Sequence, residues 1–223
     1  KALVKEKQFI SDMAHSLKTP LAVLQSQLEG SSRPNRQSLM ASVKRISQAV
    51  SEILETAWLE NGQKDKATVN LSALLEELTE ISQHLGEKKA IRIIKDFPAS
   101  PVFVLGSKQK LAKAILTVLE NAIQYGKKKG QVKIILRSEN QRAILRIIDN
   151  GPGISQKDLP FIFERFYRGQ NSLKTKGSGL GLAITKNIID DLGGEISLQS
   201  QPASGTTVTI SLPCRQSARV EII

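Results

Sequence analysis

The sequence predicts two domains: an all-α helical hairpin over residues 1–61 and an α/β two-layer domain over residues 69–214. Three observations predict this division. Apolar residues of the first part recur at alternating spacings of three and four, which is typical of helices that pair along a seam. Residues 60–66 contain no apolar residue and include a glycine, so we predict a linker over residues 62–68. Strand and helix patterns then alternate, and residues 215–223 form a tail.

Two apolar seams form the predicted hairpin. They consist of Ile10, Ala14, Leu17, Leu21, Leu24 and Leu28 in the first helix, and Leu39, Val43, Ile46, Val50, Ile53 and Ala57 in the second. A segment with Gly and Pro over residues 30–35 separates them. A lone hairpin leaves part of each apolar face in water. We therefore expect a homodimer through residues 1–61, in which two hairpins form a four-helix bundle.

One histidine of the first helix, His15, lies beside the seam position Ala14 and thus on the flank of the apolar stripe. An unperturbed imidazole is largely neutral, and so nucleophilic, at pH 7. Pro20 lacks an N–H and should bend the helix just after His15. An exposed imidazole beside a bend is a candidate phosphoryl acceptor, although a single histidine on a helix is more often ordinary surface.

Composition narrows the class of partner. The net charge is +11, and 24 of the 32 Lys and Arg residues follow residue 61. An excess of positive charge favours binding to a polyanion, or it reflects only a solvated surface. Aromatic residues make up only 4% of the chain, and no nucleic-acid motif occurs, so we expect no nucleic-acid partner. The single Cys214 excludes an internal disulfide. No apolar run reaches the ~18 residues of a membrane span.

The α/β domain can be predicted element by element. Strand patterns span residues 69–71, 90–97, 102–105, 132–137, 143–148, 195–200 and 206–212, and helix patterns span residues 72–85, 107–125 and 179–192. The fourth and fifth strands should pair as a hairpin, and the last two as another. This order predicts helices on one face of a mixed sheet.

Two polar clusters of this domain carry candidate chemistry. The helix over residues 107–125 should have a buried face with Leu111, Ile115, Val118 and Ala122. Its opposite, polar stripe consists of Lys113, Thr117, Asn121 and Gln124. The amide oxygen of Asn121 suits Mg²⁺. Asp149 ends a strand, and its carboxylate can accept a hydrogen bond from the amine of adenine. Taken alone, each cluster is equally a solvated helix face or a turn.

Two further segments flank a possible phosphate site. Residues 177–181 form a glycine-rich entry to a helix, where free N–H groups would cradle phosphates. Aromatic residues over 161–168 should anchor one end of a basic lid that extends to Lys176. The glycine cluster alone is weak evidence, and the lid is otherwise a flexible surface loop.

The order of these segments resembles the catalytic core of two-component sensor histidine kinases over nearly all 223 residues. Residues 13–21 resemble the phospho-acceptor box, 120–125 the N box, 149–153 the G1 box, 161–168 the F box and 177–182 the G2 box. The acceptor box is similar to that of PhoQ-type sensors. The resemblance implies that the second domain has the ATP-binding fold also found in gyrase, MutL and Hsp90 chaperones.

The resemblance also implies roles for individual residues. His15 would be phosphorylated from ATP with Mg²⁺ and would pass the group to an aspartate of a response-regulator receiver domain. Thr19 would orient a water when phosphate is removed from that regulator, and Asn121 would ligate Mg²⁺. Arg168 would reach the γ-phosphate. Nucleotide contacts would come from Asn121, Tyr125, Asp149, Gly151, Gly153, Lys176, Gly177, Gly179, Leu180 and Gly181.

Three residues depart from the family pattern. Ser16, which we keep among the catalytic candidates, stands where the family usually has Glu or Asp, and a hydroxyl cannot act as a base at neutral pH. Thr117 replaces the usual first Asn of the N box, and Gln124 a frequent Lys. Two alternatives therefore stand beside an autokinase: a weak kinase that acts mainly as a phosphatase of its regulator, and an ATP-driven clamp of the gyrase or chaperone kind.

The resemblance implies a location as well. The chain begins with Lys1 and not Met, so we expect an excised piece of a longer protein. It would be the cytoplasmic portion of a bacterial inner-membrane sensor, attached to the membrane only through a missing upstream segment. The remaining hypothesis, that the chain is a DNA-binding protein, is supported only by the positive net charge.

Overall fold

A computed structural model describes residues 21–22, 26, 43, 67–169 and 179–215. The chain divides into two compact units, Lys1–Gly62 and Gln63–Ile223. In the first unit the described residues Leu21, Ala22, Ser26 and Val43 are helical. The rest of the predicted hairpin, including His15, lies outside the described residues. Within the described ranges, no helix combines the length and the apolar character needed to cross a bilayer.

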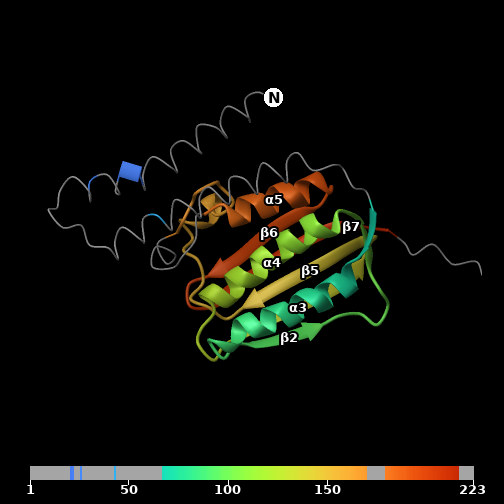
Figure 1. Ribbon diagram of the computed structural model, residues 1–223, viewed down its shortest axis with the longest axis horizontal. Coiled ribbons are helices and arrows are strands. Elements are labelled where there is room, and N and C mark those ends of the chain that lie inside the picture. The colour runs from blue at the N-terminus through green and yellow to red at the C-terminus, as the bar shows by residue number, and fades with distance from the viewer. Residues whose placement is uncertain (1–20, 23–25, 27–42, 44–66, 170–178, 216–223) are drawn as a thin grey trace, which may run out of the picture. The chain divides into compact units, whose positions relative to one another are not determined.

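The second unit is the predicted α/β domain of two layers. Its elements are β1 (Ala67–Asn70), α3 (Leu71–Glu87), β2 (Arg92–Asp96), β3 (Phe103–Gly106), α4 (Lys108–Tyr125), β4 (Gln131–Glu139), β5 (Arg142–Asp149), the short 3-10 helix η1 (Leu159–Phe161), α5 (Gly181–Asp191), β6 (Glu195–Gln201) and β7 (Gly205–Arg215). The helices α3, α4 and α5 lie side by side across one face of the sheet (Figure 1). The predicted fold class is confirmed for this unit.

The sheet has the strand order β1-β3-β7-β5-β4-β2, and β6 pairs with β7. The pair β2–β4 is parallel and the other pairs are antiparallel. Strand β7 pairs with β5 along one edge, and with β6 and then β3 along the other. The predicted hairpins β4–β5 and β6–β7 and the mixed character of the sheet are confirmed.

The start of the domain differs from the prediction by a few residues. β1 begins at Ala67, so the last two residues of the predicted linker are strand. Leu71, predicted as strand, begins α3 instead. The reason is a cap: the Asn70 side chain accepts a hydrogen bond from the Ala73 N–H at 3.0 Å, which satisfies one of the free donors of the first helical turn.

Two boundaries at the other end also differ. α5 begins at Gly181 and not at residue 179, because Gly179 has a φ of +82°, in the left-handed region that a helix does not use. Residues 179 and 180, predicted as helix, therefore belong to the loop before α5. β7 continues to Arg215, the first residue of the predicted tail.

The core lies between the helices and the sheet. Its most deeply buried side chains are Leu71, Leu74, Leu75, Leu111, Ile115, Leu119, Ile134, Leu136, Leu145, Ile147, Ile189 and Ile210. In β4 the buried Ile134 and Leu136 alternate with the more exposed Lys133 and Arg137, the period of a strand with one covered face. This packing gives the carboxyl end of β5 a fixed platform.

The N-cap of α3 provides a test of the fold. Asn70→Ala should lower the free energy of unfolding by about 1 kcal/mol, because the Ala73 N–H loses its acceptor. Urea denaturation of the full chain measures this difference. Asn70→Asp keeps the acceptor and serves as the control. Equal losses in both variants would contradict the assignment of the cap.

Candidate functional site

Asp149 is the last residue of the interior strand β5 and is half-buried. Its Oδ1 accepts a hydrogen bond from the Gly151 N–H at 2.7 Å. Burial raises the pKa of this carboxyl group, and the hydrogen bonds from the backbones of Gly151 and Thr206 partly oppose the rise. The site thus has one oriented, partly desolvated acceptor at a strand end.

The loop after Asp149 packs against backbone on two sides. A Cβ atom at Gly151 would lie 2.7 Å from the Tyr125 carbonyl oxygen, at the end of α4. Gly153 has a φ of +72°, and a Cβ there would lie 2.0 Å from the Gln201 carbonyl oxygen. No side chain fits at either glycine, so both let backbone segments approach the loop closely.

A third glycine, Gly205, was not predicted as part of the site. A Cβ atom on it would lie 2.1 Å from the Asp149 carbonyl oxygen. Asn150 was also missed; its Oδ1 accepts a hydrogen bond from the Gln131 N–H at 3.1 Å and so ties the loop to the start of β4. The sequence carries no local signal for either contact, because both partners are distant along the chain.

Helix α4 carries Asn121 and ends at Tyr125, whose carbonyl oxygen lies against Gly151. The predicted buried face of this helix is confirmed, but the place of Thr117 on the polar stripe is wrong. Thr117 is only 9% exposed because α5 packs over it, and a Cβ on Gly181 would lie 2.8 Å from Thr117 Cγ2. Tertiary packing against a second helix therefore overrides the pattern of α4 alone.

Asn121 is half-buried, and its side chain makes no hydrogen bond to another described residue. Within the described ranges, no group of three or more His, Cys, Asp and Glu side chains could hold a metal ion by itself. Mg²⁺ bound with a nucleotide needs only one or two protein ligands, since phosphates and waters complete its shell. The carboxamide of Asn121 fits such an ion.

The start of α5 forms the other side of the site. The Phe166 N–H donates a hydrogen bond to the Gly179 carbonyl oxygen at 3.0 Å, and a Cβ on Gly179 would lie 2.7 Å from the backbone of Phe166. Leu180 is buried, and Gly181 begins the helix without a side-chain cap before it. N–H groups in the first turn of a helix are suited to binding an anion. The predicted contacts Lys176 and Gly177 lie outside the described residues.

Phe161, one of the aromatic residues predicted to anchor this segment, is 44% exposed. Its ring centroid lies 5.6 Å from that of Tyr167, whose hydroxyl donates a hydrogen bond to Asp158 Oδ1 at 2.7 Å. That hydrogen bond is the main reason that the pKa of Tyr167 is raised. A ring contact and a polar contact of Tyr167 therefore both hold this segment. Arg168, which follows, is half-buried.

Two family models match the chain. The model described as the His Kinase A (phospho-acceptor) domain matches residues 5–62, and the model described as the histidine kinase-, DNA gyrase B- and HSP90-like ATPase matches residues 106–216. Sensor protein SphS of Synechococcus elongatus is 33% identical over 89% of this chain and 52% of its own length. Sensor histidine kinase YcbM of Bacillus subtilis is 30% identical over 92% of this chain and 71% of its own length.

Solved structures give the same likeness. The mycobacterial sensor histidine kinase MprB is 30% identical with a TM-score of 0.60, over 68% of this chain and 99% of that one. Two more distant structures show the fold alone. ShkA in complex with AMPPNP is 20% identical with a TM-score of 0.67, over 95% of this chain and 46% of that one. ThkA in complex with response regulator protein TrrA is 17% identical with a TM-score of 0.73, over 95% of this chain and 63% of that one. The chain spans about half the length of its first curated relatives, at 52%, 48% and 49%.

Asp149 should affect stability and binding in opposite directions. Because burial raises its pKa, the folded chain holds this proton more tightly than the unfolded chain, and ionisation lowers stability as the pH rises through the folded pKa. Asp149→Asn should therefore raise the melting temperature of the nucleotide-free chain at pH 7. The gain should shrink as the pH approaches about 3.9, the ordinary pKa of Asp.

The same substitution removes the charged acceptor, so ATP should bind roughly tenfold more weakly or worse. Thermal melts between pH 4 and pH 7 and calorimetric titration with ATP measure the two effects. A variant that is less stable than the parent chain at pH 7 would contradict the first expectation.

Proposed function

The chain belongs to the sensor histidine kinases, and from that premise we propose that it transfers the γ-phosphoryl group of ATP to His15 and then to an aspartate of a response regulator. The observation that carries the proposal is the presence of both required parts in one chain. A phospho-acceptor match covers His15, and an ATPase match covers residues 106–216, which include Asn121, Asp149 and the start of α5. An acceptor without a nucleotide site, or the reverse, could not perform the reaction alone.

The proposed domain limits follow the observed elements. Residues 1–61 are the dimerisation and phosphotransfer hairpin, and residues 62–66 are the linker, shortened because β1 begins at Ala67. Residues 67–215 are the ATP-binding domain, since β7 ends at Arg215, and the tail follows it.

In the nucleotide site each residue has a proposed role. The Asp149 carboxylate accepts a hydrogen bond from the adenine amine, and Gly151 and Gly153 leave room for the base. The phosphates lie at the start of α5, against the N–H groups near Gly179, Leu180 and Gly181. Other proposed contacts are Tyr125 on α4, and Lys176, Gly177 and Arg168 near the phosphates. Asn121 would hold Mg²⁺, which neutralises phosphate charge when bound.

The reaction takes place at the acceptor helix. An imidazole nitrogen of His15 attacks the γ-phosphorus; the new N–P bond forms while the bond from phosphorus to the bridging oxygen breaks, and ADP leaves. The imidazole proton passes to solvent, because Ser16 cannot accept it at neutral pH. A carboxylate oxygen of the regulator then attacks the phosphohistidine and takes the group, which restores His15. Positioning supplies most of the catalysis in such transfers.

The proposed partners are a second copy of this chain and a receiver domain. The seam residues Leu21 and Val43 are 44% and 45% exposed in the single chain, as expected where a second hairpin would cover them. The complex of ThkA with TrrA supports a regulator as the second partner. We propose that the chain acts on the cytoplasmic side of a bacterial membrane.

Labelling tests the main proposal. The chain should incorporate acid-labile phosphate from γ-labelled ATP with Mg²⁺, and His15→Gln should reduce incorporation at least a hundredfold, because the nucleophile is lost. Gel autoradiography after alkaline and acidic washes measures it. Equal labelling of both proteins would refute the acceptor assignment. Steady ATP hydrolysis without a phosphoprotein would favour the clamp-type ATPase instead.

A phosphatase activity toward the regulator is a second candidate function, favoured by Ser16 in place of an acid. Thr19 follows His15 by four residues in the sequence, a spacing that would place both side chains on one face of a helix. Thr19→Ala should slow loss of phosphate from a phosphorylated receiver domain about tenfold, while labelling of His15 stays within twofold. Mixing the chain with the phosphorylated regulator and ADP measures both rates. Unchanged dephosphorylation in the variant would remove Thr19 from this role.

A further inference from the structure

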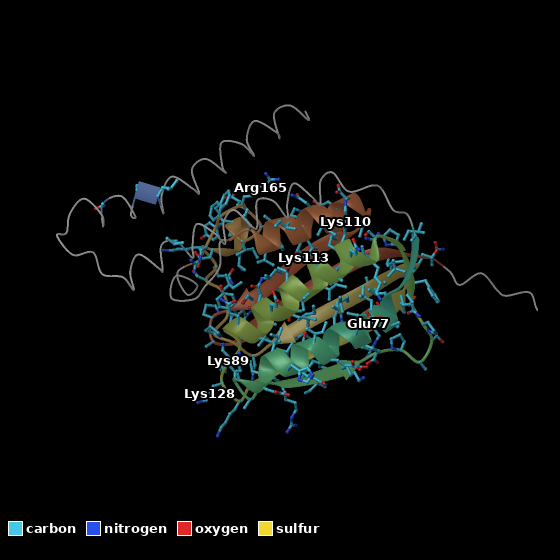
Figure 2. All side chains as sticks on the ribbon, in the orientation of Figure 1. Glu77, Lys89, Lys110, Lys113, Lys128 and Arg165 are labelled. Carbon is cyan, nitrogen blue, oxygen red and sulfur yellow. The ribbon has the colours of Figure 1, made fainter. Side chains whose placement is uncertain are left out.

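Lys89 lies in the turn from α3 to β2, at the end of the domain where α4 also ends (Figure 2). Backbone hydrogen bonds fix the turn: the N–H groups of Lys89 and Ile91 both donate to the Gly86 carbonyl oxygen, at 3.0 and 3.1 Å. Lys89 is half-buried, whereas Lys88 beside it is exposed. A partly buried ammonium must find acceptors within the fold.

Those acceptors are carbonyl groups at the C-terminal end of α4. Lys89 Nζ donates a hydrogen bond to the Ile123 carbonyl oxygen at 3.2 Å and another to the Gln124 carbonyl oxygen. The last carbonyls of a helix have no partner within the helix, and a cation beside them is favourable. α4 has no basic residue in its own last turn. Lys89 therefore supplies the missing charge from a distant part of the sequence.

The backbone of Lys89 holds the segment that follows α4. Its carbonyl oxygen accepts a hydrogen bond from the Lys129 N–H at 2.8 Å. The Arg92 N–H donates to the neighbouring Gly130 carbonyl oxygen at 2.9 Å. The side chain of Lys89 thus holds the end of the helix, and its backbone holds the turn from α4 to β4.

This end of α4 is one wall of the candidate nucleotide site. The Tyr125 carbonyl oxygen lies so close to Gly151 that a Cβ there would be 2.7 Å away. A Cβ on Gly130 would lie 2.5 Å from Asn150 Oδ1. Any displacement of the helix end would therefore move the loop that carries Asp149.

We propose that Lys89 is a positioning residue for the base-binding end of the nucleotide site, because its ammonium closes the last turn of α4 against Gly151. The inference rests on the proposed ATP-binding function. Lys89 acts through α4 and need not touch the nucleotide. Lys88, Lys127 and Lys128 are exposed in the same two turns, and their side chains form no hydrogen bond or ion pair with another described residue. They provide matched controls.

The test is binding of AMPPNP with Mg²⁺ to the full chain by calorimetry. Lys89→Met keeps the aliphatic stem and removes the charge, and it should weaken binding about tenfold. Lys89→Arg should stay within about threefold of the parent chain. Lys88→Met should bind as the parent chain does. In Lys89→Met, hydrogen exchange of the Gly126 and Lys129 amides should accelerate, while exchange in the centre of β7 should not.

Three outcomes would overturn the assignment. One is unchanged affinity in Lys89→Met; another is an equal loss in Lys88→Met; the third is a loss accompanied by faster exchange throughout the domain, which would indicate general destabilisation. If Lys89→Met does not fold, Lys89→Gln retains a donor and should bind at an intermediate strength, and full affinity there would also overturn it. AMPPNP is not transferred, so a chain that binds it but does not label His15 contradicts only the kinase proposal.

Discussion

The close approach of three backbone segments around Asp149 is the constraint on which the site depends. The loop after β5 meets the end of α4 at Gly151, the β6–β7 turn at Gly153, and the start of β7 at Gly205. Each contact is too short to admit a Cβ atom, so the loop has almost no freedom to shift. The acceptor at the strand end is therefore held by main-chain atoms of elements far apart in the sequence, and the core beneath them fixes those elements.

Periodicity predicted most of the α/β domain because its elements each have one covered face. The alternation in β4 and the buried stripe of α4 needed no knowledge of their partners. Thr117 was misplaced for the converse reason. The burial of Thr117 depends on α5 crossing α4. A pattern along one element does not contain that fact.

The glycines of the site were predicted only where a local sequence motif marks them. Gly151, Gly153 and Gly179 stand in motifs that chemistry suggests, so they were predicted. Gly205 begins β7 and Lys89 stands in the turn after α3, and both matter only through what they touch across the fold. Stability and binding make opposite demands on Asp149. Burial raises the pKa of its carboxyl group and so disfavours the negative charge, yet that charge makes the group a strong hydrogen-bond acceptor.

The place of β7 in the sheet has a consequence for biosynthesis. β7, the last of the described strands, lies between β3 and β5 and also pairs with β6. A nascent chain that stops short of it has the group β1–β3, the group β5–β4–β2 and an unpaired β6, all with exposed edges. The ribosome must therefore release all of residues 67–215 before the domain can fold cooperatively, and until then the exposed edges can pair wrongly with other chains.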